Sequence, residues 1–400
     1  MALSPQESAL RDRLLTMQPE MVRRLAEMVA VPSGGGHAPG LERMRAMVAA
    51  RLQAMGASVE LVPSAARPVW VDPVPASDVR PPTLVARRTE GRSGPHLLLS
   101  GHLDTVHDPH GPFQKLQHRG DGAMTGPGGA DMKGGVEVML SALEALEALA
   151  VPVAWTVLLV GDEESGSFGS ADTIAREAAR HDRAFVVEPA TPSGDLVVQR
   201  PGSGQFLIEA TGRAAHAGRD FAQGVSAVQA LAKAVLVAGA LADPARGRIV
   251  NVGPLQGGVA TNIVPDTARA WGNLRYTDEA EGEALGRAID ATACGGETDL
   301  PRVRVRRVHN RPAKPCTAAV RALGERAQAV AADLGLRVGL ASTGGVSDAN
   351  LIQHAGPPTL DGLGVRGGNL HRTDEFLWPD SLSERAALLA ILLARESAIR

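Results

Sequence analysis

Five short segments of the sequence place histidine or acidic residues beside glycine or at the end of an apolar run. They read GHLDTV (from Gly101), GPGGADMKGG (from Gly126), GDEESGS (from Gly161), VVEPA (from Val186) and GGNLHRTDE (from Gly367). Their candidate metal ligands and proton acceptors are His102, Asp131, Glu163, Glu164, Glu188 and His371. Imidazole and carboxylate groups are ligands that Zn²⁺ accepts in proteins. One such segment is weak evidence, but five in order predict a site for two zinc ions.

His102 follows an apolar run from His96 to Ser100, which predicts a buried strand. Ligand sites of open α/β sheets lie at the C-terminal ends of the strands. In an extended chain His102 and Asp104 point the same way, so Asp104 is expected to hold the second imidazole nitrogen while the first binds metal. The alternative is an ordinary turn in which a histidine lies beside an acid.

Asp131 lies in a glycine-rich stretch that allows backbone conformations closed to other residues. A carboxylate that bridges two metal ions has to enter a tight site, and such a stretch permits it. The same glycines suggest a phosphate-binding loop. However, the order of glycine and lysine fits neither the dinucleotide fingerprint nor the P-loop.

A second apolar run, Trp155–Val160, opens directly into the adjacent acids Asp162, Glu163 and Glu164. Their mutual repulsion favours bound cations. Consecutive residues of an extended chain face opposite ways, so Glu164 is expected to bind metal while Glu163 takes a proton from the metal-bound water. A solvated acidic turn at the start of the next helix is the alternative.

Two further residues complete the predicted ligand set. Glu188 ends a third apolar run, Phe185–Val187, and is therefore placed like His102, whereas His371 returns from a distant segment. Taken alone, His371 would be interpreted as a surface histidine.

The predicted ligands carry three negative charges, on Asp131, Glu164 and Glu188. Two Zn²⁺ ions would leave the cluster with about one positive charge. Such a cluster acidifies water and polarises a carbonyl, with the ions roughly 3.5–4 Å apart.

These motifs, in this order and over nearly the whole chain, resemble those of the zinc-dependent M20 metallopeptidases. That family includes glutamate carboxypeptidase, acetylornithine deacetylase and succinyl-diaminopimelate desuccinylase. The resemblance implies that His102, Asp131 and Glu188 hold one zinc ion, and that Asp131, Glu164 and His371 hold the other. Asp131 would then be the bridge, and Co²⁺ or Mn²⁺ is expected to substitute for zinc.

The resemblance also assigns roles around the metals. Glu163 would be the general base, Asp104 would orient His102, and the peptide bond from Asp131 to Met132 would be cis. VVEPA and the stretch DGLGVRGGNLHRTDE (from Asp361) are most similar to the glutamate carboxypeptidase branch. The chain departs from that pattern at the expected mouth of the pocket, through His107, Asp108 and His110.

Composition limits the other classes of function. The chain has 400 residues, 44% of them hydrophobic, which is enough for two domains. A net charge of −3 and only 3% aromatic residues argue against nucleic acid as a partner. We find no signal region and no membrane-spanning run, so the protein is expected in the cytoplasm without a membrane partner. Cys294 and Cys316 are interpreted as ordinary thiols.

The expected fold is α/β, with a zinc-peptidase catalytic domain formed by residues 1–198 and 312–400. It would contain a mixed central sheet flanked by helices, among them an amphipathic helix over residues 41–55 that feeds a strand at Ser58–Val62. Residues 63–82 are rich in proline and predict a surface linker. Ser381 and Glu384 predict a capping box ahead of the last helix.

Residues 199–311 alternate strands and helices differently and predict an inserted α+β, ferredoxin-like domain for a lid and for dimerisation. The expected strands are 204–210, 248–252, 268–276 and 303–308, and the expected helices are 225–240 and 280–293.

Two stretches of the insertion resemble family motifs, RAAHAG (from Arg213) and TNIVPDTARAWGNLRY (from Thr261). The resemblance implies that His216 stabilises the oxyanion and that Asn262 helps to bind substrate, both in the partner subunit's site. Arg275 would clamp a substrate carboxylate, in a pocket completed by Arg311 and Gly345. A helix-capping turn for His216 and a solvated strand arginine for Arg275 are the alternatives.

Together these features predict a homodimeric two-zinc amidohydrolase that cleaves a peptide or N-acyl bond beside a free carboxylate. The substrate would be a small peptide or an acylated amino acid such as acylglutamate. A deacylase of the acetylornithine or succinyl-diaminopimelate type is the alternative enzyme. A zinc-holding protein without catalysis is the alternative outside enzymes, and it would need neither Glu163 nor His216.

Overall fold

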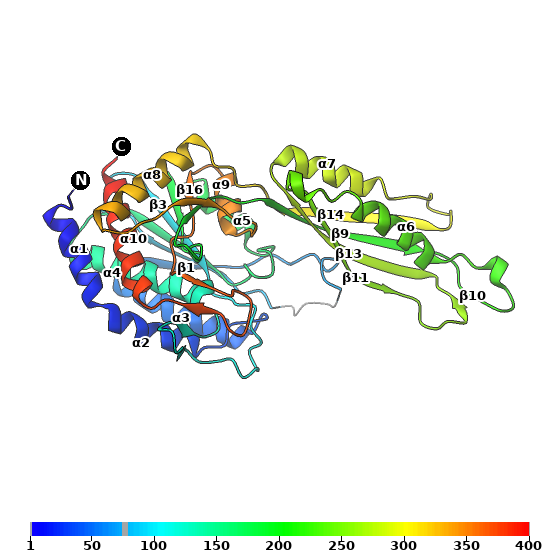
Figure 1. The fold of residues 1–400 in the computed structure, drawn as a ribbon, viewed down its shortest axis with the longest axis horizontal. Coiled ribbons are helices and arrows are strands. Elements are labelled where there is room, and N and C mark those ends of the chain that lie inside the picture. Colours follow the sequence, from blue (N-terminus) through cyan, green and yellow to red (C-terminus); the bar gives the residue numbers. More distant parts are fainter. Residues whose placement is uncertain (1, 74–78, 400) are drawn as a thin grey trace.

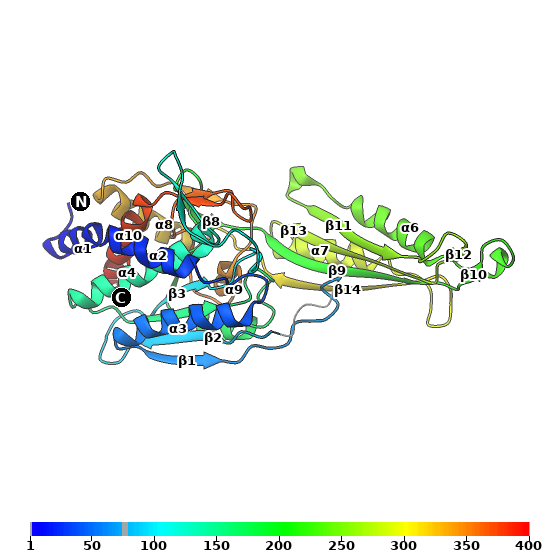
Figure 2. The ribbon, with the colours of Figure 1, turned by 90° about the horizontal axis from the view of Figure 1, so that it is seen from below.

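The computed structural model describes residues 2–73 and 79–399 as two parts with separate hydrophobic cores. The larger part contains both ends of the described chain, and the smaller part projects from it (Figures 1 and 2). The long strands β9 (Gly202–Thr211) and β14 (Arg302–Arg311) lead from one part into the other.

A six-stranded mixed sheet forms the centre of the larger part, as the sequence predicts. Its strands, in spatial order, are β1 (Ser58–Val62), β2 (Thr83–Arg88), β6 (Trp155–Val160), β3 (Leu97–His102), β7 (Arg183–Val186) and β16 (Thr359–Leu360). The strands from β6 to β16 are parallel, whereas β1 and β2 run antiparallel to their neighbours. Strands β3 and β6 are buried along their whole length, which explains why both read as continuous apolar runs.

Helices cover both faces of this sheet. Leu97 and Leu99 face one layer, whereas Leu98 faces the other, because successive side chains of a strand point in opposite directions. The first layer contains α1 (Pro5–Thr16), α2 (Gln18–Val29), α3 (Ala38–Ala54), α4 (Gly135–Ala148), α8 (Ala318–Asp333) and α10 (Asp380–Ala398). The second contains α5 (Ala171–Ala178) and α9 (Asp348–His354). Within residues 2–73 and 79–399, no helix is both long and apolar enough to cross a membrane.

Strand β1 and helix α3 confirm the elements predicted near the amino end. The predicted linker has neither helix nor strand over residues 63–73 and 79–82, and its remaining residues, 74–78, lie outside the described residues.

The capping box predicted from Ser381 and Glu384 is wrong. Helix α10 already begins at Asp380, so Ser381 lies inside the helix. The Ser381 hydroxyl donates to the carbonyl of Trp378 at 2.6 Å instead of capping an amide of the helix. Glu384 pairs with Arg366 at 3.2 Å.

The smaller part has the βαββαβ order of a ferredoxin-like fold. Its elements are β9 (Gly202–Thr211), α6 (Ala227–Gly239), β11 (Ile249–Gly257), β13 (Thr267–Tyr276), α7 (Glu279–Asp290) and β14 (Arg302–Arg311). The sheet is antiparallel with the order β11-β13-β9-β14, and both helices pack into one core on it. Every strand and helix expected here is present, while the exact domain limits at residues 199 and 311 stay a prediction.

Short strands and helical turns lie between the main elements of both parts. They are β4 (Gln117–His118), β5 (Met124–Thr125), β8 (Leu196–Gln199), β10 (Ala215–His216), β12 (Ile263–Val264), β15 (Leu340–Ser342), β17 (Gly367–Gly368), β18 (Phe376–Leu377) and the irregular helical turns η1 (Gly129–Gly134), η2 (Phe221–Gln223) and η3 (Pro244–Arg246). Pairing of β5 with β18 brings the segment of Asp131 next to the segment of His371.

Candidate metal centre and active site

Three neighbouring parallel strands deliver predicted ligands to one edge of the central sheet. His102 is the last residue of β3, Glu164 follows β6, and Glu188 follows β7. The edge formed by the carboxyl ends of parallel strands is where α/β proteins place their ligands.

All five predicted metal ligands meet at this edge. Asp131 is central, because its Oδ1 lies 3.2 Å from His102 Nε2 and its Oδ2 lies 3.4 Å from His371 Nε2. Glu188 Oε1 lies 3.9 Å from His102 Nε2, and Glu164 Oε2 lies 3.3 Å from His371 Nε2. The peptide bond after Asp131 is cis, as the resemblance implies.

The electrostatics of the cluster fit bound cations. Hydrogen bonds to Asp131 and Glu164 raise the pKa of His371 to about 10. Burial raises the pKa of Glu164 to about 7 and also raises the pKa of Glu188. Glu164 Oε1 is buried and has no hydrogen-bond partner among the described residues. Buried acids that resist ionisation, one with an unsatisfied oxygen, are the environment that a divalent cation stabilises.

Asp104 connects the first ligand to the acidic turn. Its carboxylate accepts hydrogen bonds from the backbone amides of Glu163 at 3.3 Å and Glu164 at 2.9 Å. His102 Nδ1 lies 2.9 Å from the backbone carbonyl of Asp104 and 3.4 Å from its carboxylate. The nearer partner of the imidazole is thus the carbonyl, although the sequence prediction named the carboxylate.

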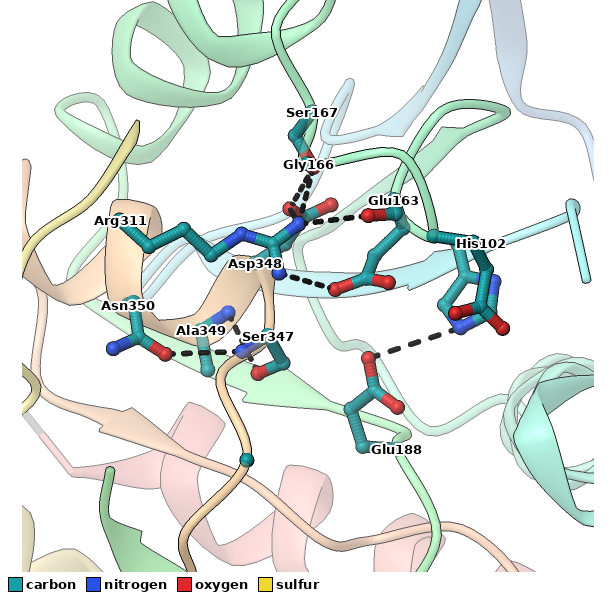
Figure 3. A network of polar contacts seen from close by, with 12 residues as sticks. His102, Glu163, Gly166, Ser167, Glu188, Arg311, Ser347, Asp348, Ala349 and Asn350 are labelled. Carbon is teal, nitrogen blue, oxygen red and sulfur yellow. Dashed lines mark hydrogen bonds and ion pairs between the residues drawn. The ribbon is translucent and has the colours of Figure 1, made fainter. Parts of the chain in front are cut away.

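Glu163 lies beside the cluster but contacts a buried arginine (Figure 3). Arg311 Nη1 donates to Glu163 Oε1 at 2.5 Å, and Arg311 Nη2 donates to the Glu163 carbonyl at 3.0 Å. Arg311 Nη2 also donates to Ser167 Oγ at 2.7 Å and Asp348 Oδ1 at 3.1 Å. Both terminal nitrogens of Arg311 therefore have partners within the protein.

Arg275, near Arg311, has a terminal guanidinium nitrogen without a partner, whereas in Arg311 only Nε lacks one among the described residues. Arg275 Nη1 is buried without a hydrogen-bond partner among the described residues. Burial lowers its pKa, and the charge of nearby Arg311 lowers that pKa further.

The backbone carbonyl of Gly345 accepts a hydrogen bond from Arg200 Nη1 at 3.2 Å, and Arg200 Nε donates to the Asp361 carboxylate at 2.7 Å. Sequence reasoning missed the buried pair of Arg200 and Asp361, which no quoted motif marks as a pair.

His216 and Asn262 lie together but away from the metal cluster of their own chain. His216 is exposed on β10, and the Asn262 carbonyl accepts the amide of Ala217 at 2.9 Å. Strands β10 and β12 occupy the end of the smaller part farthest from the central sheet (Figures 1 and 2). One chain alone therefore does not bring these residues to the ligands.

The three residues expected at the mouth of the pocket, His107, Asp108 and His110, differ in their exposure to solvent. His107 is buried and contacts Glu375 at 2.6 Å, whereas Asp108 and His110 are exposed. Sequence reasoning missed Glu375, although it belongs to the quoted segment GGNLHRTDE.

A cavity of about 780 Å³ opens beside Asp104 and Glu164. Its walls include Arg67, Val106 and Phe168.

Comparison with known proteins agrees with this arrangement. Residues 98–395 match the model of Peptidase family M20/M25/M40. The chain is 30% identical over 360 residues to carboxypeptidase G2 of Pseudomonas sp. (strain RS-16), covering 88% of this chain and 83% of that protein. It is 30% identical over 375 residues to a succinyl-diaminopimelate desuccinylase of Methylobacterium radiotolerans, covering 87% of this chain and 90% of that protein.

The fold is similar to that of a tripeptidase from Staphylococcus aureus, with a TM-score of 0.73 and 24% identity over 94% of this chain and 99% of that one. This likeness extends over both parts of the molecule. The family match spans all five ligand segments completely and begins just before Gly101. The chain therefore belongs to peptidase family M20/M25/M40 and is a hydrolase that acts on amide bonds.

Proposed function

We propose that this protein is a two-zinc hydrolase that cleaves a peptide or N-acyl bond beside a free carboxylate. The observation that carries the proposal is the position of Asp131, whose two carboxylate oxygens face different histidines at 3.2 and 3.4 Å. Each of these histidines also lies within 4 Å of a second acid, Glu188 or Glu164.

The residues divide into two overlapping ligand sets. His102, Asp131 and Glu188 would hold one ion, and Asp131, Glu164 and His371 the other. When bound, the ions would acidify a water molecule and polarise the scissile carbonyl. Co²⁺ or Mn²⁺ would bind the same nitrogen and oxygen ligands.

Glu163 is the general base in this proposal. It takes a proton from the attacking water and returns it to the leaving amine. Its bond to Arg311 supports this role, because it keeps the carboxylate beside the ligands while leaving it out of both ligand sets. Asp104 supports the same geometry by holding the Glu163 amide.

The substrate carboxylate would be bound by Arg275, whose unpaired nitrogen supports this assignment. The contributions predicted for Arg311 and Gly345 remain proposals, and the internal partners of Arg311 mean that it would also hold Glu163. Similarity to carboxypeptidase G2 favours a peptide that ends in a free carboxylate. The motif resemblance to the glutamate carboxypeptidase branch favours acylglutamate among such substrates. Similarity to succinyl-diaminopimelate desuccinylase favours an N-acyl amino acid deacylase as the second candidate.

We further propose a homodimer in which His216 and Asn262 complete the partner subunit's site. The edge strand β11 and helix α6 support it through exposed apolar side chains. Leu255 is 57% exposed, Leu236 75% and Val237 55%. An unpaired strand edge beside exposed leucine and valine is suited to pairing with another chain.

A pair of matched substrates tests the proposal. N-acyl amino acids and dipeptides are assayed with zinc, cobalt and manganese, each as the free acid and as the C-terminal amide. The amide should have a lower kcat/KM than the acid, because Arg275 loses a charged partner. The decrease should correspond to a loss of ~2–5 kcal/mol in transition-state stabilisation. Equal turnover of acid and amide would rule out the carboxylate requirement, and turnover unaffected by a chelator would rule out the metal.

A further inference from the structure

A buried carboxylate outside both ligand sets, that of Glu375, is surrounded by donors. Glu375 is 1% exposed. Its Oε1 accepts the backbone amides of Ala130 at 2.8 Å and Asp131 at 3.0 Å. Its Oε2 accepts the amide of Gly128 at 3.3 Å and lies 2.6 Å from His107 Nε2. Four donors therefore converge on one side chain.

These contacts join three of the segments that carry ligands. Glu375 follows His371 by four residues, and His107 follows His102 by five. The amides belong to the turn that carries Asp131, so one carboxylate connects the first, the bridging and the last ligand segments.

The surroundings fix His107 against this carboxylate. His107 is 9% exposed, and its ring meets Phe113 edge to face with 5.1 Å between the ring centres. A buried carboxylate is costly unless hydrogen bonds satisfy it, so each donor to Glu375 contributes to holding it in place.

We propose that His107 and Glu375 form a positioning pair for the metal site. Glu375 holds the amide of Asp131, and only two side-chain torsions separate that backbone from the carboxylate oxygens. A shift of the amide would therefore move both oxygens relative to His102 and His371. The inference rests on the proposed function, because it concerns the geometry that the two ions require.

Zinc affinity is the most direct readout of this role. We expect Glu375→Gln and His107→Phe to weaken zinc binding by about 10- to 100-fold, as loss of groups that orient metal ligands does. The Phe variant keeps the ring against Phe113 but lacks the donor. His107→Gln restores a donor and should recover most of the affinity. In all three variants kcat should change more than KM, because none of them removes a substrate contact.

Glu396→Gln is the matched control. Glu396 is fully buried in α10 and is held by Arg326 at 2.6 Å and Arg183 at 3.1 Å, outside the ligand cluster. This variant should lower the melting temperature while leaving zinc affinity unchanged. It separates a loss of buried charge pairing in general from a loss at the metal site.

Competition titration with a zinc-binding dye, with folding checked by circular dichroism, decides the outcome. Wild-type affinity in Glu375→Gln or His107→Phe would overturn the inference, and so would equal losses in His107→Phe and His107→Gln. If Glu375→Gln does not fold, the comparison of the two His107 variants decides alone. A wild-type protein that binds no zinc would overturn the proposed function itself.

Discussion

Glu163 and Glu164 are adjacent acids with different surroundings. Glu164 Oε2 lies 3.3 Å from His371, whereas Glu163 Oε1 is bound by Arg311 at 2.5 Å. The first environment belongs to the ligand cluster and the second lies beside it. At the scale of single residues, this difference is the basis for separating metal binding from proton transfer.

Replacing each acid by its amide should separate the two roles. Glu163→Gln should retain zinc and substrate affinity but lose ~10²–10⁴-fold in kcat, because only proton transfer is removed. Glu164→Gln should lose zinc, since an amide is a poor ligand. Metal analysis and steady-state kinetics on both variants test the prediction, and equal loss of metal in the two would refute the division of roles.

Zinc binding to the ion-free protein should release protons. Hydrogen bonds to Asp131 and Glu164 raise the pKa of His371 to about 10, so this histidine is protonated at pH 8 in the ion-free state. A histidine must be deprotonated to bind zinc, and zinc affinity should therefore fall as the pH falls below about 10. Calorimetric titrations at pH 8 in buffers of different ionisation enthalpy count the protons. The His371→Gln variant should release fewer protons on binding zinc than the wild type does. Absence of proton release by the wild type would contradict this account.

Close packing between elements fixes how far apart the ligand segments lie. Gly135 begins α4, directly after the turn that carries Asp131, and it packs against Val187, which lies between β7 and Glu188. A Cβ atom at Gly135 would lie 1.9 Å from the carbonyl oxygen of Val187. Any side chain there would push α4 away from the sheet.

Gly135→Ala should therefore destabilise the protein and weaken the metal site together. The expected loss is ~1–3 kcal/mol in the free energy of unfolding, as for other overpacked positions. Gly239→Ala is the control, because it lies in α6 with no atom within 4 Å of its Cβ position and should cause no loss. Urea unfolding and zinc titration measure both effects. Wild-type stability of Gly135→Ala would show that this contact is not limiting.

Local patterns predicted the elements that position the ligands, but not the contacts between distant segments. The apolar run Trp155–Val160 and the acids after it indicated both a buried strand and the site at its end. The contact of Glu375 with the Asp131 amide joins residues 244 positions apart, and no sequence pattern encodes it. Ser381 had the spacing of a helix cap, but its hydroxyl bonds the carbonyl of Trp378, a contact set by where the helix begins.

At the scale of the whole molecule, the role proposed for His216 depends on how far this residue lies from the ligand cluster. The exposed end of the smaller part carries His216, while the ligands lie at the central sheet (Figure 1). A second subunit that brings its own His216 to this cluster would resolve the separation.

Mixed dimers test this arrangement. Glu163→Ala and His216→Ala homodimers should each be nearly inactive. After co-refolding equal amounts, half of the dimers are mixed, and each mixed dimer has one site with both residues intact, so activity should recover to about a quarter of wild type. A tag on one variant confirms that mixed dimers form. Confirmed mixed dimers without activity would place His216 in its own subunit's site or outside catalysis.

The central claim is that hydrolysis requires two ions held around Asp131. The most direct measurement is a zinc titration of the ion-free protein in which bound metal and hydrolysis of an N-acyl amino acid are followed in the same samples. We predict that activity saturates at two zinc ions per chain, and that His371→Ala binds one ion preferentially and remains nearly inactive. Full activity at one ion per chain or at none would contradict the account.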